Sequence, residues 1–297
     1  MNSFFIRKIL FHDMQYPKHI NTIHKGQIGR VLIIGGSPQY YGAPILTALA
    51  AEFSGADLIS LYIPANHLEA AKKYSLNFLL YSFPQHPGYL SLYDVKIVQE
   101  ISANAIVIGN GMGRDFDAKK AMLAIINTEK PVVIDGDALI PEILKIYNSK
   151  KHKWILTPHA GEFERVFACK ATPENIVSVA KEFSLNLCVK GPTDHIIACN
   201  DFAIDSYDLL LNGENINHNK ELYENETGVP QMRIGGTGDA LAGIICSYVS
   251  QGFSALQAMR AATYLFGKCG EEMLKHRSHF SAKALIKFFA KLNASKE

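Results

Sequence analysis

The sequence predicts an α/β fold in which a mostly parallel central sheet carries helices on both faces. Short apolar runs rich in valine and isoleucine alternate with longer segments of helical periodicity. Most of these runs are apolar on both faces, as buried parallel strands are. No linker rich in proline and serine and no internal repeat interrupts the 297 residues. We therefore expect a single domain over residues 1–297.

The first two thirds of the chain supply most of the expected elements. RVLIIGG at 30–36 predicts a strand, and ILTALAAEF predicts a helix with Pro44 at its first position and Gly55 after its end. ADLISLYIP predicts the next strand. Further strands are expected in SLNFLLYSF, NAIVIGN, PVVIDGD, KWILTP and NLCVKG, and further helices at 66–73, 92–101, 116–128, 141–148, 161–168 and 173–184.

The pattern changes after Lys190. DHIIACN and FAIDSYD predict two short antiparallel strands, whereas LLNGENINHNKELYENETG is polar and asparagine-rich and predicts a surface excursion. A helix is then expected from Thr237 until Gly252 stops it. A second helix follows Ser254, which fits a capping box with Gln257.

Composition and charge argue against several classes of function. The net charge is +2 and basic residues are scattered, which gives no electrostatic footprint for nucleic acid. The short basic groups at 24–25 and 150–153 predict solvated loops or helix ends. Five cysteines lie far apart without metal-ligand spacing and predict reduced thiols. The N-terminus does not resemble a signal peptide, and no window reaches the length of a membrane span. We expect a cytoplasmic protein without membrane partners.

The stretch GGTGDALAG, at 235–243, indicates an anion site with an acid beside it. Its glycines allow several backbone amides to point into one cavity, and the following helix adds its positive end, a combination that binds phosphate. Asp239 is unfavourable beside a polyphosphate unless it accepts a proton from a hydroxyl that attacks phosphorus. The alternative is a glycine-rich turn in which Asp239 is an ordinary first-turn acid that stabilises the helix dipole.

Other glycine-containing turns follow expected strands. KGPTD, at 190–194, is either part of a ligand site at a strand end or a simple hairpin turn. The stretch TPHAGEFERVF follows an expected strand and exposes His159. This histidine is either a site residue or an ordinary polar loop residue. GNGMGRD fails the dinucleotide fingerprint because Arg114 replaces the last glycine, and GGSPQYYGAP has no P-loop lysine. Five such junctions, at 35–43, 109–113, 135–137, 157–161 and 190–191, would meet in one crevice at the edge of a parallel sheet.

Taken in order, these motifs resemble the NAD(P)H-hydrate dehydratase family, a branch of the ribokinase-like superfamily. The resemblance extends from about His24 to about Tyr264. The chain departs from the family pattern at Asn110, Met112 and Gly136, which are substitutions that a glycine-lined loop would absorb. The matching stretches are HKGQIGRVLIIGGSPQYYGAPILTALAAEFSGAD, GNGMGRD, VVIDGDAL, ILTPHAGEFERV, VKGPTD and NETGVPQMRIGGTGDALAGI.

The resemblance implies a three-layer ribokinase-like fold and a repair reaction. Hydrated NADH or NADPH, in its S form, would be dehydrated at the expense of ADP or ATP, with Asp239 as the base. Mg²⁺ is expected, with Asp135 and Glu162 as candidate ligands. The implied hydrate-binding residues are Ala43, Gly111, Gly113, His159 and Asp239, and the implied nucleotide-binding residues are Lys190, Gly191, Pro192, Thr193, Asp194, Gly236, Thr237 and Gly238.

The resemblance also implies partners. Family members tend to form homotetramers, and the apolar stretch 284–292 either contributes to such a contact or packs in the core of its own subunit. We expect a separate protein to supply the epimerase step that fused family members carry. The sequence does not decide between ADP and ATP, although the resemblance to stand-alone microbial members favours ADP. The segment 212–227 has no assigned role.

Two other functions would use the same motifs. A kinase of a small alcohol, such as a vitamin precursor, would release its phosphorylated product, whereas the dehydratase eliminates phosphate. A non-catalytic nucleotide sensor would keep the binding loops, but a neutral residue would suit such a site better than Asp239. The observation that distinguishes these functions is whether hydrated NADH and ADP together give the absorbance of reduced nucleotide.

Overall fold

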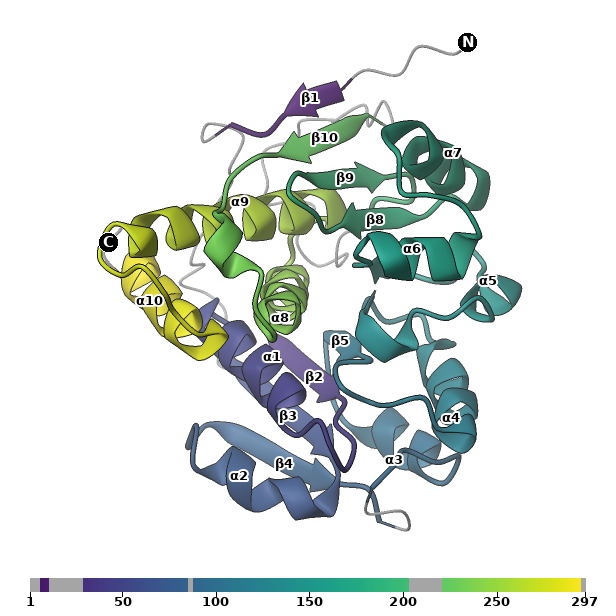
Figure 1. Cartoon of the computed structure of the whole chain (residues 1–297). Coiled ribbons are helices and arrows are strands. Elements are labelled where there is room, and N and C mark those ends of the chain that lie inside the picture. The colour runs from purple at the N-terminus through teal and green to yellow at the C-terminus, as the bar shows by residue number, and fades with distance from the viewer. Residues whose placement is uncertain (1–5, 11–28, 85–87, 203–220, 295–297) are drawn as a thin grey trace.

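Ten strands form one sheet at the centre of the structure (Figure 1). The computed structural model describes residues 6–10, 29–84, 88–202 and 221–294. The strand order is β1-β10-β9-β8-β7-β6-β5-β2-β3-β4, and all neighbours are parallel except the two pairs that involve β9. The strands are β1 Ile6–Lys8, β2 Arg30–Ile34, β3 Leu58–Ile63, β4 Phe78–Ser82, β5 Ala105–Ile108, β6 Val132–Ile134, β7 Trp154–Leu156, β8 Asn186–Val189, β9 Asp194–Ala198 and β10 Leu222–Asn225.

Helices cover both faces of this sheet. Alternate residues of β2 point into two separate buried clusters: Val31 and Ile33 into the first, Leu32 and Ile34 into the second. Helices α1, α2, α8, α9 and α10 contribute to the first cluster and α3 to α7 to the second, which confirms the three-layer α/β fold. The helices are α1 Gly42–Phe53, α2 Leu68–Lys72, α3 Asp94–Glu100, α4 Phe116–Ile126, α5 Ile143–Ile146, α6 Ala160–Phe167, α7 Pro173–Phe183, α8 Thr237–Ser250, α9 Ala255–Leu274 and α10 Ala282–Ala294, with short 3₁₀ turns at Ala65–His67, Gly136–Ala138 and Pro230–Met232.

The strand order reverses between β2 and β5. Strands β3 and β4 extend the sheet on one side of β2, whereas β5 to β8 continue on its other side. Helix α1, which follows β2, packs in the first cluster, and α4, which follows β5, packs in the second. The two connecting loops therefore diverge to opposite faces, and such a switch point opens a crevice at the carboxyl ends of the strands.

Helices α1 and α8 pack closely in the first layer. At Gly243 of α8, an added Cβ would lie only 2.2 Å from the carbonyl oxygen of Thr47 in α1. Only glycine permits this approach, because real Cβ atoms do not come so close to another heavy atom. The N-termini of both helices lie at the same edge of the sheet, because Asp239 in the first turn of α8 accepts from Asn110 and Ala43 in the first turn of α1 lies beside Gly111.

Most of the expected elements are present, with some differences. The predicted helix after β2 begins at Gly42, so Pro44 is not its first residue. The capping box of Ser254 and Gln257 is confirmed at the start of α9. The apolar stretch of α10 packs within its own chain, because Leu285, Ile286 and Phe289 are buried in the first cluster.

The predicted surface excursion at 210–228 is wrong in its last part. Residues Leu222–Asn225 form β10, which pairs with β9 and with β1. The pairing depends on backbone hydrogen bonds to strands elsewhere in the chain, which the polar local sequence does not reveal. Apart from Phe202, the predicted strand FAIDSYD lies outside the described residues, as does most of the segment 212–227. None of the helices in the described ranges has the length and apolarity needed to cross a membrane.

Candidate active site

Five strand ends bring the glycine-containing loops together at one edge of the sheet. Strands β2, β5, β6, β7 and β8 are consecutive parallel neighbours, so the loops that follow them all leave from the same edge. The first turn of α8 reaches this edge from the first helical layer. All five loops thus lie at one edge of the sheet, and those at 157–161 and 190–191 also line the cavity described below.

A hydrogen-bonded network at this edge is centred on Asp135, which follows β6. Its Oδ1 accepts from Lys190 Nζ at 2.6 Å and from Thr157 Oγ1 at 2.8 Å. Its Oδ2 accepts from Asn110 Nδ2 at 2.8 Å. The same nitrogen of Asn110 donates to Asp239 Oδ1, also at 2.8 Å. The network therefore joins the ends of four strands to helix α8.

Asp239 lies in the first turn of α8 with its pKa shifted. Burial and the nearby negative charge of Asp135 raise the pKa of Asp239 to about 6, against the opposing effects of the Asn110 hydrogen bond and the Lys190 charge. A carboxylate with such a pKa is mostly ionised at neutral pH and still accepts a proton readily. Asp239 can therefore act as a general base.

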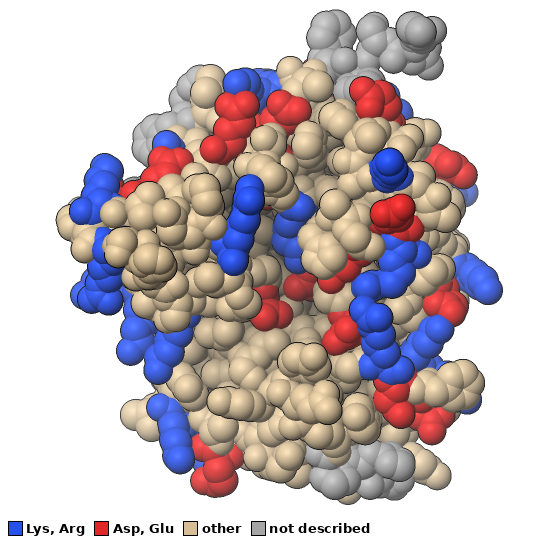
Figure 2. Space-filling view, viewed as in Figure 1, with Lys and Arg blue, Asp and Glu red and all other residues tan. Residues whose placement is uncertain are grey.

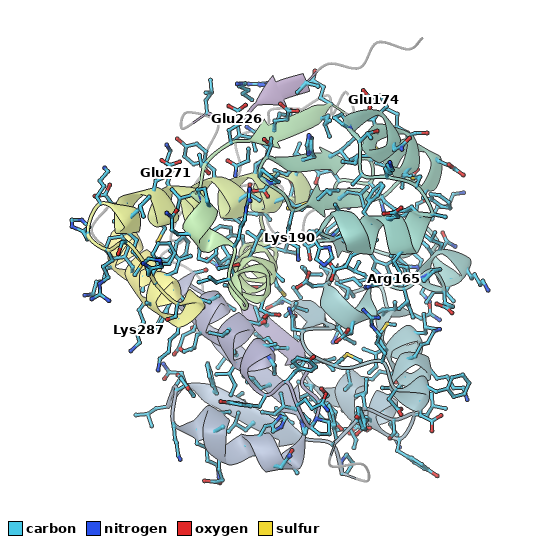
Figure 3. The ribbon with its side chains drawn as sticks, viewed as in Figure 1. Arg165, Glu174, Lys190, Glu226, Glu271 and Lys287 are labelled. Atoms are coloured by element: carbon cyan, nitrogen blue, oxygen red, sulfur yellow. The ribbon has the colours of Figure 1, made fainter. Side chains whose placement is uncertain are left out.

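Lys190 is the cation of the network, and Glu162 faces it from α6. Burial alone would lower the pKa of Lys190, but the charges of Asp135 and Glu162 outweigh burial and raise it. Burial raises the pKa of Glu162, which accepts a hydrogen bond from the His159 backbone at 2.9 Å. Lys190 remains an ammonium group beside several carboxylates. Figure 3 shows it directed into the interior of the site.

An open cavity of about 710 Å³ lies beside this network, between the β8–β9 turn and helices α8 and α9. Figure 2 shows the hollow near the middle of one face, with acidic side chains inside it and basic side chains along its upper edge. The cavity is lined by six of the predicted nucleotide-binding residues, namely Lys190, Gly191, Pro192, Asp194, Thr237 and Gly238.

Two other predicted nucleotide residues shape the cavity without lining it. Gly236 has φ +97° and precedes α8, so it provides the left-handed turn through which the chain enters the helix. Thr193 belongs to the tight β8–β9 turn, where Asp194 Oδ1 accepts from the Gly191 amide at 3.1 Å. KGPTD is therefore both a hairpin turn and part of the cavity wall.

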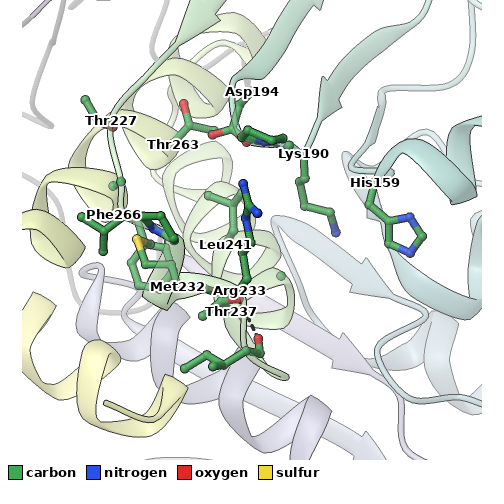
Figure 4. Close-up of a pocket in the computed structure, with 18 residues that line it drawn as sticks. His159, Lys190, Asp194, Thr227, Met232, Arg233, Thr237, Leu241, Thr263 and Phe266 are labelled. Atoms are coloured by element: carbon green, nitrogen blue, oxygen red, sulfur yellow. Dashed lines mark hydrogen bonds between the residues drawn. The ribbon is translucent and has the colours of Figure 1, made fainter. Parts of the chain in front are cut away.

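Sequence reasoning did not identify the far wall of the cavity. Met232, Leu241 and Phe266 give it an apolar surface, and Arg233 extends into it (Figure 4). The segment that carries Arg233 is anchored on α9, where Glu271 accepts from the Gly228 amide at 3.0 Å. One residue, Ile234, separates Arg233 from the GGTGD motif, and this local sequence gives no indication of the direction of the Arg233 side chain.

The predicted hydrate-binding residues fall into two groups. Ala43 and Gly111 touch at the switch point, where an added Cβ on Gly111 would lie 3.0 Å from the Ala43 Cβ. Gly113 lies in the same loop, and its amide donates to Asp137 at 2.9 Å. His159 lies apart from them, in the cavity wall, and its Nδ1 caps α6 by accepting from the backbone of Gly161. Asn110, next to Gly111, connects the first group to the fifth predicted residue, Asp239, through the hydrogen bond to its Oδ1.

The described residues contain no group of three or more histidine, cysteine, aspartate or glutamate side chains that could hold a metal ion. The candidates Asp135 and Glu162 both lie near Lys190, which neutralises part of their charge. Any divalent ion here would need most of its ligands from another molecule.

Comparisons with known proteins agree with this arrangement. A family model described as NAD(P)H-hydrate dehydratase matches residues 31–204 and 209–291. A bifunctional NAD(P)H-hydrate repair enzyme of Hyperthermus butylicus is 36% identical over 267 residues, which cover 83% of this chain and 45% of that protein. An ADP-dependent (S)-NAD(P)H-hydrate dehydratase of Nitrosopumilus maritimus is 29% identical, covering 87% of this chain and 86% of that protein. The chain spans about half the length of the bifunctional relatives it matches.

Solved structures show the same fold. An ADP/ATP-dependent NAD(P)H-hydrate dehydratase from Bacillus subtilis, co-crystallised with ATP/Mg²⁺, superimposes with a TM-score of 0.76 at 22% identity, covering 95% of this chain and 94% of that one. A ribokinase-like superfamily protein from Enterococcus faecalis gives the same TM-score and identity, covering 98% and 97%. At these identities the similarity concerns the fold, which is ribokinase-like.

Proposed function

The chain belongs to the NAD(P)H-hydrate dehydratase family, and we propose that it uses ADP or ATP to convert hydrated NADH or NADPH back to the reduced nucleotide. One observation carries this proposal. Asp239, a base with a pKa of about 6, directly follows Gly238 of the cavity wall, and its Oδ1 accepts a hydrogen bond from Asn110, the neighbour of Gly111. A base between two binding regions suits the transfer of a phosphoryl group from one substrate to a hydroxyl of the other.

The cavity is the proposed nucleotide site. Its apolar wall suits a nucleobase, and the start of α8 supplies amides for phosphates, because the N-terminus of a helix attracts anions. We assign the amides of Gly236, Thr237 and Gly238 and the ammonium group of Lys190 to the phosphates. Gly191, Pro192, Thr193 and Asp194 would form the edge of the site at the β8–β9 turn.

The hydrate is proposed to lie at the switch point. Ala43, Gly111 and Gly113 leave room for its ring and phosphates because none of them projects more than a methyl group. His159 would contact it from the opposite wall. In this position the C6 hydroxyl of the hydrated ring can reach Asp239, while the terminal phosphoryl group of the nucleotide lies at the α8 amides.

The reaction then proceeds in two stages. Asp239 accepts the proton of the C6 hydroxyl as its oxygen attacks the terminal phosphorus and the phosphoanhydride bond breaks, releasing AMP from ADP or ADP from ATP. The amides of Gly236 to Gly238 stabilise the charge that develops on the phosphoryl group. The lone pair of the ring nitrogen next expels phosphate from C6, and loss of a proton from C5 restores the double bond.

We propose that Mg²⁺ arrives with the nucleotide. It commonly binds through one or two carboxylates together with substrate phosphates and keeps several waters. Asp135 and Glu162, the two carboxylates whose charges act on Lys190, fit that limited role. Asp135 already accepts hydrogen bonds at both oxygens. The ion would neutralise phosphate charge, while Lys190 supplies a fixed positive charge from the chain itself.

The test is a direct assay of purified hydrated NADH with ADP and with ATP, run in parallel. Formation of reduced-nucleotide absorbance with release of phosphate is expected, and the Asp239→Asn variant should lose it. A stable phosphorylated product without that absorbance would instead indicate a small-molecule kinase. Nucleotide binding without any turnover would indicate a sensor.

We also propose two kinds of partner for this chain. The first is a homo-oligomer in the form of a tetramer, which light scattering of the purified protein tests. Epimerisation of the R hydrate is proposed to come from a separate protein, since the bifunctional relatives are about twice as long as the matched region. Adding an epimerase to the assay should then allow complete use of a mixture of R and S hydrates.

A further inference from the structure

Asn110 links the two carboxylates at the centre of the site. Its Nδ2 lies 2.8 Å from Asp135 Oδ2 and 2.8 Å from Asp239 Oδ1, and the residue is only 1% exposed. A side-chain amide nitrogen carries two hydrogens, so it can donate one to each carboxylate. Within the described residues the amide oxygen Oδ1 has no hydrogen-bond partner. The contribution of Asn110 to the site is therefore its pair of donors.

The backbone that carries Asn110 is closely confined. Its carbonyl oxygen accepts from the Gly36 amide at 2.9 Å, and an added Cβ on Gly35 would lie 2.4 Å from that oxygen. On the other side, Gly109 has φ +113°, and an added Cβ there would lie 1.9 Å from the Asp135 carbonyl oxygen. The loops after β2, β5 and β6 thus hold the Asn110 amide in one place.

Such a fixed donor matters because Asp135 and Asp239 carry like charges and come from different elements. Lys190 is hydrogen-bonded to Asp135 and not to Asp239. Among the described residues, Asn110 is the one side chain that donates a hydrogen bond to the Asp239 carboxylate. It occupies Oδ1 and leaves Oδ2 available to another donor.

We propose that Asn110 is a positioning residue, which holds Asp239 by Oδ1 so that Oδ2 faces the hydroxyl of the hydrate. The inference rests on the proposed role of Asp239 as the base. Asn110 touches neither substrate and acts on the reaction through Asp239 alone. Its loss should slow the chemical step and leave binding of both substrates nearly unchanged.

The test measures kcat and KM separately in two variants that remove the donor. Asn110→Leu replaces the amide by an apolar group of similar size, and Asn110→Asp replaces it by an acceptor of the same shape. We expect kcat to fall by about 10- to 100-fold in both, because small misplacements of a catalytic group have effects of this order. The KM values for ADP and hydrate, and the Kd for ADP by calorimetry, should change by less than about twofold on the same argument.

The matched control is Asn104→Leu. Asn104 lies just before the other end of β5, and its Oδ1 accepts from the Arg30 amide at 3.0 Å. This variant also removes a hydrogen bond between β5 and a neighbouring segment, but far from Asp239. It should lower the melting temperature without lowering kcat.

The outcomes separate this inference from the proposed function. Wild-type kcat in both Asn110 variants, with an inactive Asp239→Asn variant, would overturn the positioning role and leave the function standing. Losses of similar size in kcat and in the affinity for ADP would also overturn the positioning role. If wild-type protein fails to dehydrate the hydrate, the proposed function itself fails. If Asn110→Leu does not fold, Asn110→Asp decides, and failure of both to fold would assign Asn110 to stability alone.

Discussion

Lys190 Nζ lies 2.6 Å from Asp135 Oδ1, across strand β7, which separates the strands that carry the two residues. Their side chains are 17% and 4% exposed, so the pair is largely removed from water. A buried pair of this kind leaves an uncompensated charge when one partner is removed. Lys190 therefore has a structural role before any nucleotide binds.

The Lys190→Met variant should lose both stability and nucleotide affinity. Removing one partner of a buried ion pair costs about 3–5 kcal/mol, to be measured by urea unfolding. ADP binding, measured by calorimetry, should weaken as well. Lys119→Met is the control, since Lys119 pairs with Glu142 at about one-third exposure and such a pair contributes less than about 1 kcal/mol. The double variant Lys190→Met/Asp135→Asn should recover part of the lost free energy of unfolding, because it leaves no unpaired buried charge. If it does not, the ion pair does not explain the loss.

The pH dependence of turnover should follow Asp239. Its pKa is raised to about 6, first by burial and then by the charge of Asp135, and only the ionised form can accept a proton. The value of kcat/KM should therefore rise with pH up to about 6 and level off above it. In Asp135→Asn the midpoint should move to lower pH, because the neighbouring negative charge is gone.

Phosphate groups of the nucleotide also titrate near this pH. The control is the pH dependence of ADP binding by calorimetry over the same range. A midpoint that follows ADP affinity and does not move in Asp135→Asn would assign the profile to the nucleotide and not to Asp239.

Arg233 should contribute to phosphate binding, because it extends into the cavity that contains Lys190 and the first turn of α8. Losing a hydrogen bond to a charged group costs about 1.5–3 kcal/mol, which corresponds to about 10- to 100-fold in Kd. Arg233→Met should show this loss for ADP, and comparison with AMP and ATP identifies the phosphate concerned. The exposed Arg277, which does not line the cavity, is the control as Arg277→Met. Equal ADP affinity in all three proteins would refute the role.

Gly243→Ala, a substitution at a position outside the candidate site, should destabilise the protein. The new Cβ would lie 2.2 Å from the Thr47 carbonyl oxygen and would force α1 and α8 apart. Overpacking of this kind costs about 1–3 kcal/mol, to be measured by urea unfolding. Gly42→Ala, at the start of α1, is the matched control, since nothing lies within 4 Å of its added Cβ. Equal stability of the two variants would show that the helices adjust freely.

The sequence predicted the layers of the fold because buried parallel strands have a distinctive composition. Runs such as RVLII are apolar on both faces, and the structure places their alternate residues in two clusters. Strands β1 and β10 were not predicted. Residues Leu222–Asn225 stand in a polar, asparagine-rich stretch and Ile6–Lys8 form a strand of only three residues, so both depend on pairing with other strands.

The sequence also predicted where the candidate site lies, because its glycine-containing motifs follow strands that share one edge. It did not predict how Asn110 and Arg233 contribute. From the sequence, Asn110 was expected to be a substitution that its glycine-lined loop absorbs. Its two hydrogen-bond partners lie 25 and 129 residues away in the chain. No local pattern reports such contacts. The same holds for His159, whose ring caps α6 while its side chain is 60% exposed.

The first turn of α8 has a consequence for how this kind of enzyme can diversify. The amides assigned to phosphate and the carboxylate assigned to proton transfer belong to one rigid helical turn, so their spacing is independent of the acceptor molecule. Most residues assigned to the acceptor lie outside that turn, with Ala43 at the start of α1, Gly111 and Gly113 in the loop after β5, and His159 in the loop after β7. Exchanging those loops would give a new acceptor the same transfer chemistry, and a hybrid that carries the loops of a ribokinase-like relative should phosphorylate that relative's alcohol.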